Sequence, residues 1–307
     1  MDVCVVGAGA IGGWVAARLA LAGHCVMAVN SGGPLGHLDV SEHGETKTAA
    51  FSHLDAPARL LVLAVKAPAL PTAAAALGTV VGPDTIVLPM LNGVPWWFVE
   101  SAPLRSVDPA GTVATALPLP QVVGCVVHAS CYRDGPGRIV VKHADKLIVG
   151  EPRGGPSDRV AEVRELFEGA GIRCDASDNI RRAIWYKLWG NATINPLSAL
   201  TRATADRILA QPECRAWMLE GMAELAAVGA AISCPITESG EDRIKVTERL
   251  GAFRTSMLQD VEAGRPIELE ALLGAPREIA RREGIPTPAL DRLYGVTRLT
   301  AETLGLI

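Results

Sequence analysis

The residues with the clearest chemical pattern are a lysine and two asparagines in the second half of the chain. Lys187, Asn191 and Asn195 are spaced four residues apart, so on an α-helix they share one face and drift by only about 40° per step. Their apolar neighbours are Trp185, Leu188, Trp189 and Ile194. A cation and two amides beside so much apolar surface are costly unless a polar group meets them. The pattern predicts a site for a small polar substrate, with an exposed stripe on a surface helix as the alternative.

Hydroxyl and carboxylate groups that could complete this chemistry follow nearer the C-terminus. Ser256 lies in the segment 256–260, and Glu268 lies in the segment 265–270. A lysine amine that faces a carboxylate in a partly dry cleft is a workable acid–base pair, because the ammonium donates a proton while the carboxylate orients the substrate. The sequence does not say whether Lys187 and Glu268 meet. Glu268 could instead be a charge that stabilises a helix N-terminus.

A glycine motif near the N-terminus predicts a dinucleotide site. The string GAGAIG matches GxGxxG, follows an apolar strand and opens a helix rich in Ala and Leu. In this context Gly7 permits the tight turn, Gly9 lets the backbone approach a pyrophosphate, and Gly12 lets helix and strand pack closely. The pyrophosphate would bind the free N–H groups of the first helical turn, which includes Ala10 and Ile11. A glycine-rich turn without a ligand is the alternative.

The end of the second strand bears on the choice between NAD and NADP. NAD sites place Asp or Glu about 20 residues beyond the glycines, where the acid binds the ribose 2′-OH. Here the string from Asn30 to Gly33 occupies that position, and the next acid is Asp39. The missing negative charge leaves room for a 2′-phosphate, although no arginine is present to bind it. The sequence therefore favours NADP and leaves NAD open.

Two further polar residues follow apolar strands. Lys66 closes the third clear strand, and Asn92 follows the next one, in an Asn-Gly pair. Ligands of open parallel sheets collect at the carboxyl ends of the strands, so both residues are candidates for contacts with cofactor or substrate. A solvated lysine and a plain Asn-Gly turn are the alternatives.

The pattern of the first half predicts the scaffold for these residues. Apolar runs predict strands at 2–6, 25–29, 60–65 and 85–88, with a helix at 10–22. Strands that alternate with helices are typical of a doubly wound α/β fold with a parallel sheet. Between residues 112 and 149, β-branched runs separated by Gly-Pro turns predict antiparallel hairpins appended to that sheet, at 122–127, 138–141 and 146–149.

The remainder of the chain is predicted to be helical after a short run at 172–175. Helix-like periodicity covers 179–195, 212–231, 239–250, 256–262, 268–283 and 288–304. We therefore predict two domains. Residues 1–177 form a Rossmann-type dinucleotide-binding domain, and residues 178–307 form an all-helical substrate and catalytic domain.

Composition excludes several classes of protein. The 307 residues are 49% hydrophobic and 20% charged, which is enough apolar material for a large core. A net charge of −4 argues against nucleic-acid and anionic-membrane partners, and no apolar run reaches the roughly 18–20 residues that span a bilayer. The seven cysteines are scattered without a CxxC pair, so we expect no disulfide framework and no metal site, and a reducing cytoplasm fits best.

Longer motifs resemble those of the ketopantoate reductase (2-dehydropantoate 2-reductase) family. Five segments occur in the same order and at the same separations as in that family. They are GAGAIGG at the start, VLAVK at 62–66, LNG at 91–93, WYKLWGNATINPLSALT at 185–201 and TSMLQDVEAGRPIELEALLGA at 255–275. The resemblance covers essentially the full length, and the last two blocks are far more specific than GxGxxG. It implies an oxidoreductase of pantothenate biosynthesis that reduces a 2-oxo acid with NADPH, bound between a Rossmann domain and a helical domain.

The resemblance also implies roles for single residues. Lys187 matches the general acid that protonates the oxo oxygen, and Glu268 matches the acid that holds the substrate and tunes that lysine. The residues that match binders of the substrate carboxylate and hydroxyl are Asn191, Asn195 and Ser256. Lys66 and Asn92 match contacts on the cofactor side and in the active site.

Three positions depart from the family pattern. No arginine follows the second strand for the 2′-phosphate, and Ser31 stands near that position. Phe253 replaces an asparagine that some members carry three residues before the serine. The string PWWF after Asn92-Gly93 replaces smaller or more polar residues. The last two departures predict a bulkier, more apolar substrate pocket, unless Trp96 and Trp97 belong to the core or to a contact between two copies.

Two other functions stay open. A 3-hydroxy-acid dehydrogenase couples the same two kinds of domain with a catalytic lysine and asparagine, but the GRPxE block speaks against it. A non-catalytic NADP-binding sensor would keep the fold, but loss of catalysis should have let at least one of the implied site residues drift. Assembly as a homodimer is also left open.

Overall fold

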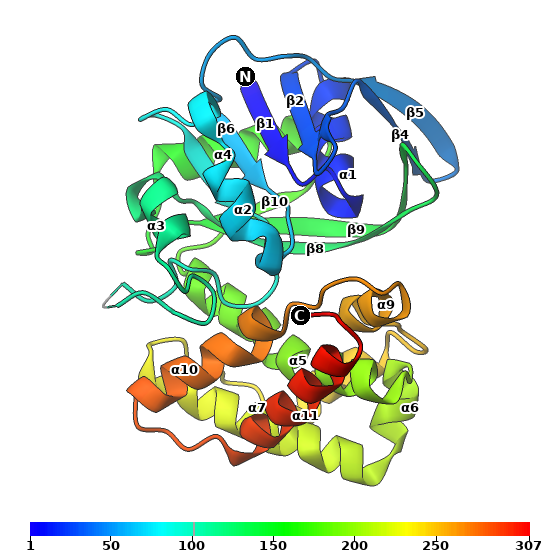
Figure 1. Cartoon of the computed structure of the whole chain (residues 1–307), viewed down its shortest axis with the longest axis vertical. Helices are drawn as coiled ribbons and strands as arrows, with labels where there is room; N and C mark the ends of the chain where they lie inside the picture. Colours follow the sequence, from blue (N-terminus) through cyan, green and yellow to red (C-terminus); the bar gives the residue numbers. More distant parts are fainter. Residues whose placement is uncertain (101) are drawn as a thin grey trace. The chain divides into compact units, whose positions relative to one another are not determined.

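The computed structural model describes residues 1–100 and 102–307 (Figure 1). The chain divides into two compact units, of which the first contains residues 1–91 and 111–183 and the second contains residues 92–110 and 184–307. The second unit is therefore discontinuous in sequence. As a consequence, Asn92 belongs to the same unit as Lys187.

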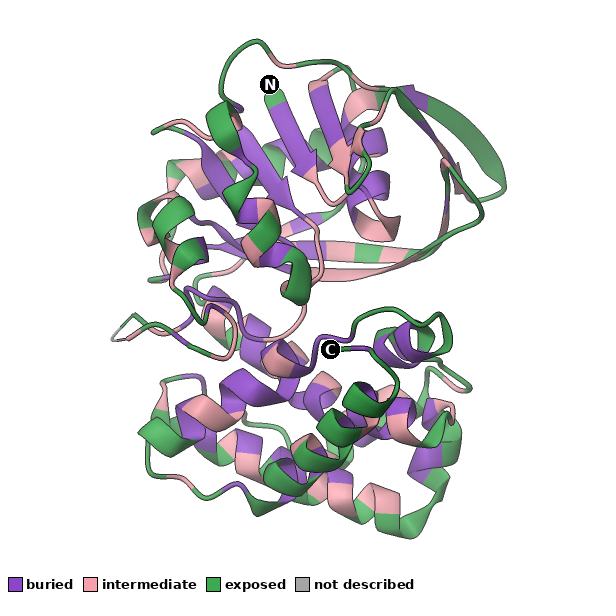
Figure 2. Ribbon diagram, in the orientation of Figure 1, coloured by how far each residue is buried: buried purple, intermediate pink, exposed green. Residues whose placement is uncertain are grey.

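The first unit contains a mostly parallel five-stranded sheet in the order β3-β2-β1-β6-β7. The strands are β1 (Asp2–Val6), β2 (Cys25–Asn30), β3 (Gly33–Pro34), β6 (Leu60–Leu63) and β7 (Ile86–Pro89). Only the short β3 pairs antiparallel. Every residue of β6 and β7 is buried (Figure 2), as expected for parallel strands covered on both faces. The predicted Rossmann-type α/β fold is confirmed.

A second sheet in this unit corrects the prediction of hairpins appended to the first one. It has the order β10-β9-β4-β5, and β8 pairs with β9. Its strands are β4 (His37–Glu42), β5 (Glu45–Ala50), β8 (Gly124–Arg133), β9 (Arg138–Gly150) and β10 (Cys174–Ala176). The two predicted runs at 138–141 and 146–149 form one strand, because register shifts accommodate Lys142 and Asp145 without ending the pairing with β8.

Helix α1 (Ala10–Leu21) joins the two sheets, since it contacts β1 and β2 of the first and β5 and β8 of the second. Its side chains Trp14 and Leu19 are buried in the core that the sheets share. The other α-helices of this unit are α2 (Leu70–Ala75), α3 (Thr112–Ala116) and α4 (Asp158–Gly169). The carboxyl ends of β1, β2 and β6 therefore stand next to the start of α1, where the glycine motif lies.

The second unit is helical, as predicted. Its helices are α5 (Ile180–Thr201, in this unit from residue 184), α6 (Ala205–Ala210), α7 (Pro212–Ala231), α8 (Gly240–Glu248), α9 (Ser256–Glu262), the π-helix η4 (Glu270–Gly274), α10 (Ala275–Arg282) and α11 (Pro288–Thr303). Helix α5 continues beyond the predicted end at Asn195 and contains Pro196. All three residues of the Lys187 pattern therefore lie on one helix.

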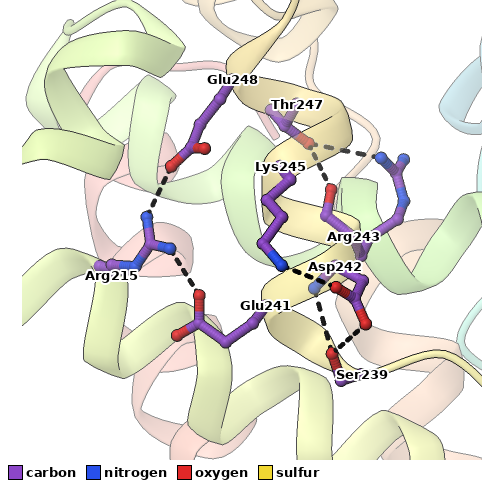
Figure 3. A network of polar contacts seen from close by, with 8 residues as sticks. All are labelled: Arg215, Ser239, Glu241, Asp242, Arg243, Lys245, Thr247 and Glu248. Carbon is purple, nitrogen blue, oxygen red and sulfur yellow. Dashed lines mark hydrogen bonds and ion pairs between the residues drawn. The ribbon is translucent and has the colours of Figure 1, made fainter.

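Ion pairs hold α8 against α7 at the surface of this unit (Figure 3). Arg215 of α7 contacts Glu241 at 2.5 Å and Glu248 at 2.8 Å. Ser239 caps α8, because its hydroxyl accepts the N–H of Asp242 at 3.1 Å. Within the described part of the chain, no helix is long and apolar enough to cross a membrane.

Candidate active site

The turn between β1 and α1 uses each of its three glycines differently. Gly7 has φ +92°, and a Cβ there would lie 2.5 Å from the backbone N of Val65. A Cβ on Gly12 would lie 2.3 Å from the backbone O of Gly7. A Cβ on Gly9 would meet only the Gly7 O, at 3.9 Å. The first and third glycines are thus required by the protein's own packing, whereas the second leaves open space beside the start of α1.

The first turn of α1 offers donors to that space. Gly9 is the N-cap residue, and no side chain caps the helix. The N–H groups of Ala10 and Ile11 have no intrahelical partner, because the first turn of any α-helix lacks them. Free N–H groups at the positive end of a helix dipole attract anions. The geometry of these residues fits the pyrophosphate of a dinucleotide.

A pocket of about 500 Å³ adjoins this turn. Its wall is largely apolar and includes Met27, Val29, Val65, Ala73 and Leu77, while Asn30 and Ser31 line it at the end of β2. None of its described lining residues carries an acidic or basic side chain. Burial raises the pKa of the Cys4 thiol in this wall to about 12, which keeps the thiol neutral. The pocket suits the flat, apolar face of an adenine ring.

Asn30, which precedes the predicted residue Ser31, and the predicted residue Lys66 lie at the edges of this region. The side chain of Asn30 is engaged locally, because its Oδ1 accepts the N–H of Gly32 at 2.8 Å. Lys66 follows β6, is partly buried and precedes the 3₁₀ helix Ala67–Ala69. The sequence analysis did not include the segment of α2, where Ala73 and Ala76 line the pocket. Small residues at helical spacing were the available signal.

Two tryptophans fix the rotation of α5 in the second unit. The indole N–H of Trp185 donates to the backbone O of Leu225 at 3.0 Å, and that of Trp189 donates to the backbone O of Met222 at 2.7 Å. Both acceptors are on α7. Lys187 and Asn191 each follow one of these tryptophans by two residues and so point about 200° away from it. The polar face of α5 is thereby turned away from α7.

Lys187, Asn92 and Glu268 form a continuous polar contact. The Nζ of Lys187 donates to Asn92 Oδ1 at 3.0 Å, and Asn92 Nδ2 donates to Glu268 Oε2 at 3.3 Å. Glu268 is buried, with 8% of its surface exposed. The amide of Asn92 therefore connects the lysine with the carboxylate. The sequence analysis considered a pair of Lys187 and Glu268 and did not place Asn92 between them.

A backbone contact holds Asn92 in this place. Gly93 has φ +81°, and a Cβ on it would lie 2.4 Å from the O of Ala271. The next residue, Val94, donates its N–H to that same O at 2.8 Å. In the π-helix η4 this carbonyl would bond to residue 276, which is a proline without an N–H. The carbonyl is therefore available to dock the segment that carries Asn92.

The other predicted residues offer hydrogen-bonding groups. Asn195 is 3% exposed, and its side-chain amide bonds to none of the residues that the structure describes. Within the same described part, the side chains of Asn191, which is partly buried, and of Ser256, which is exposed, also have no hydrogen bond. A polar group on a largely buried side chain gains from a hydrogen-bond partner, so Asn195 is suited to meet a polar ligand.

Burial supports the core alternative for the aromatic residues after Asn92. Trp96 and Trp97 are 4% and 5% exposed, and Phe98 stacks on Trp185 with ring centroids 5.8 Å apart. Stacking and burial of such large rings stabilise the packing of this aromatic segment against α5. Phe253, in contrast, keeps 37% of its surface exposed.

Comparison with known proteins agrees with this geometry. The sequence profiles described as ketopantoate reductase PanE/ApbA and as its C-terminal part match residues 3–154 and 179–301. The chain belongs to the ketopantoate reductase family. A 2-dehydropantoate 2-reductase of Mesorhizobium japonicum is 35% identical, and the match covers 99% of both chains.

Solved structures extend this result. A Ralstonia solanacearum protein classed as a ketopantoate reductase is 44% identical, with a TM-score of 0.93 over 100% of this chain and 99% of its own. D-mandelate dehydrogenase, solved with NADH and anilino(oxo)acetate, shares the fold at 19% identity, with a TM-score of 0.85 over 100% of both chains. The protein is an NAD(P)-dependent oxidoreductase of the ketopantoate reductase family, and the fold by itself does not select between the two nucleotides.

Proposed function

We propose that this ketopantoate reductase family member reduces a 2-oxo acid to the 2-hydroxy acid with NADPH and that Lys187 is the general acid. The observation that carries the proposal is the contact of Lys187 with Asn92 and of Asn92 with Glu268, at 3.0 and 3.3 Å. It is supported by the free amides of Asn191 and Asn195 on the same helix.

Lys187 donates its proton to the oxo oxygen of the substrate. Negative charge builds on that oxygen as the carbon is reduced, and a fixed ammonium stabilises this charge more in the transition state than in the ground state. Asn92 is a neutral partner, so its hydrogen bond orients the ammonium without neutralising it. Glu268 holds the other end of Asn92 and binds the substrate.

Asn191, Asn195 and Ser256 bind the substrate carboxylate and hydroxyl through groups that have no partner within the described residues. Asn195 is suited to this role because it is almost fully buried, and a hydrogen bond in such surroundings is stronger than one in water. The three groups hold carbon 2 in a fixed orientation, which accounts for a large part of the rate of such reactions.

The nucleotide is held by residues of the first unit. The proposed contacts are Gly7, Gly9, Ala10, Ile11, Gly12, Ser31, Lys66 and Asn92. NADPH supplies the hydride when it is bound. NADPH is proposed rather than NADH because no carboxylate lines the pocket at Asn30 and Ser31, so nothing there repels a 2′-phosphate. In this proposal residues 1–177 form the dinucleotide-binding domain and residues 178–307 form the substrate and catalytic domain.

The first substrate to test is 2-dehydropantoate, which places the protein in pantothenate biosynthesis. Bulkier 2-oxo acids follow, because Phe253 exposes part of its ring three residues before Ser256. We also propose a cytoplasmic location, since all seven cysteines are free thiols, and a homodimeric assembly.

The test is a panel of 2-oxo acids assayed with NADPH and NADH, and a second panel of 3-hydroxy acids assayed with NADP+ and NAD+, in parallel with direct measurement of nucleotide binding. Turnover of a 2-oxo acid with NADPH supports the proposal. Turnover restricted to 3-hydroxy acids indicates the other dehydrogenase class. Tight nucleotide binding without any turnover indicates a sensor and overturns the proposal.

A further inference from the structure

A chain of buried hydroxyl groups connects α5 with the start of α9. Ser198 of α5 is fully buried, and Thr255, the N-cap residue of α9, is 1% exposed. Their hydroxyl oxygens are hydrogen-bonded to each other. The Ser198 hydroxyl also donates to the backbone O of Asn195 at 2.7 Å, and Thr255 Oγ1 accepts the N–H of Leu258 at 3.1 Å.

The direction of every hydrogen bond in this chain is fixed by chemistry. The carbonyl of Asn195 can only accept, so the single hydroxyl proton of Ser198 is committed to it. Thr255 must then donate to Ser198, while its own oxygen accepts from Leu258. The chain therefore has one consistent arrangement, and removal of either hydroxyl leaves a buried polar group without its partner.

The chain begins at the backbone O of Asn195 and ends at the N–H of Leu258 in the first turn of α9. It therefore joins Asn195 to the helix turn that carries Ser256, the residue directly after Thr255, and we propose both Asn195 and Ser256 as substrate ligands. The helix between Asn195 and Ser198 contains Pro196, which cannot donate the usual backbone bond to residue 192. Helices bend readily at such a position, so the orientation of Asn195 depends on tertiary contacts.

We propose that Ser198 and Thr255 are positioning residues, which set the separation between the Asn195 amide and the Ser256 hydroxyl and thereby shape the site for the substrate carboxylate. This inference rests on the proposed reduction of a 2-oxo acid. It assigns the two hydroxyls a role in substrate recognition in addition to the capping of α9.

A buried hydroxyl that only stabilises its own helix provides the matched control. Thr297 of α11 is 1% exposed and donates to the backbone O of Leu293 at 2.7 Å. It lies in the same unit as Ser198 and Thr255, but its bond stays within one helix. Thr297→Val therefore removes a hydroxyl of equal burial without touching the connection between α5 and α9.

The experiment measures KM for the 2-oxo acid, kcat, nucleotide affinity and melting temperature. We expect Thr255→Val and Ser198→Ala to raise KM about tenfold or more, with a smaller change in kcat and an unchanged Kd for the nucleotide. Thr255→Ser, which keeps the hydroxyl, should restore KM. Thr297→Val should lower the melting temperature with KM unchanged. If Thr255→Val does not fold, Ser198→Ala carries the same expectation, because it leaves the α9 cap in place.

A second set of variants separates positioning from general loosening of the unit. In a Ser256→Ala background, Thr255→Val should add little to KM, since the group that it positions is already gone. Full additivity overturns the inference, and so does a KM for Thr255→Val equal to that of Thr297→Val. In both cases turnover by the unmodified protein leaves the proposed function standing. Absence of turnover with every 2-oxo acid overturns the function and this inference together.

Discussion

The two units build their candidate sites from different parts of the chain. In the first unit the backbone dominates, through a glycine turn, the N–H groups of α1 and a pocket wall without charged side chains. In the second unit side chains dominate, since Lys187, Asn92 and Glu268 come from three separate segments and meet through specific atoms. We therefore expect the site in the first unit to lose function when a substitution adds a side-chain atom next to its backbone. The site in the second unit should lose function when a substitution removes a side-chain group.

The largest effect is expected in the side-chain site. Lys187→Ala removes the proton donor and the charge that stabilises the developing oxyanion, so kcat should fall by about 10³-fold. Nucleotide affinity, measured by fluorescence titration, should stay within about twofold because the pocket belongs to the other unit. Lys245→Ala is the control, since this exposed lysine of α8 pairs with Asp242, at 2.9 Å. Equal losses of kcat and nucleotide affinity would contradict the role of Lys187.

In the backbone site of the first unit, two glycine-to-alanine variants can separate the effect on folding from the effect on nucleotide binding. Gly12→Ala places a Cβ 2.3 Å from the Gly7 O, so the free energy of unfolding should drop by about 1–3 kcal/mol or more. Gly9→Ala meets nothing closer than 3.9 Å, so the nucleotide-free protein should keep its stability. Its nucleotide Kd should nevertheless rise about tenfold or more, because the methyl group fills the space of the pyrophosphate. Denaturant unfolding and binding titrations of both variants check this pair. Unchanged binding by Gly9→Ala would show that no phosphate group lies there.

A smaller effect is expected at the rim of the pocket, where charge is missing. Asn30→Asp introduces the acid that binds a ribose 2′-OH and repels a 2′-phosphate, so it should shift the ratio of the two Kd values about tenfold toward NADH. Ser31→Arg should shift the same ratio about tenfold toward NADPH, because a guanidinium binds phosphate well. Competition binding with both nucleotides measures the ratio. If neither variant changes it, the ribose lies elsewhere in the pocket.

Features that depend on local sequence were predicted correctly, whereas features that depend on contacts between distant segments were not. The bounds of β1, α7 and α9 were predicted as the structure has them, because each is a local pattern with a clear start. Strands β4 and β5 were missed. Their segment is rich in charged and polar residues, and in it only Leu38, Val40 and Ala49 are buried, so the period-two signal is weak.

In the candidate active site, too, local features were predicted from the sequence and long-range contacts were not. The shared helix of Lys187, Asn191 and Asn195 was predicted from spacing alone. The link from Asn92 to Glu268 joins residues 176 positions apart, and no local periodicity encodes such a contact. It depends on the free carbonyl of Ala271 that docks Val94, a consequence of a π-helix followed by a proline. The roles of the residues in these contacts stay predictions until the variants are measured.

The smallest effect is expected for side-chain contacts at the surface of the helical unit. Arg215→Met removes the ion pairs with Glu241 and Glu248 (Figure 3), but both acids are about half exposed, at 50% and 45%. The free energy of unfolding should therefore fall by only about 0.5–1 kcal/mol at low salt. The difference should shrink in 1 M NaCl, where charges are screened beyond about 3 Å. Denaturant unfolding at two salt concentrations measures this difference. The control is Arg292→Met, which breaks an exposed pair to Glu220.

A loss well above 1 kcal/mol that persists in salt would mean that packing of the Arg215 stem, rather than its charge, holds α8 against α7. The helical unit would then depend on close packing at its surface as the first unit does at its glycine turn.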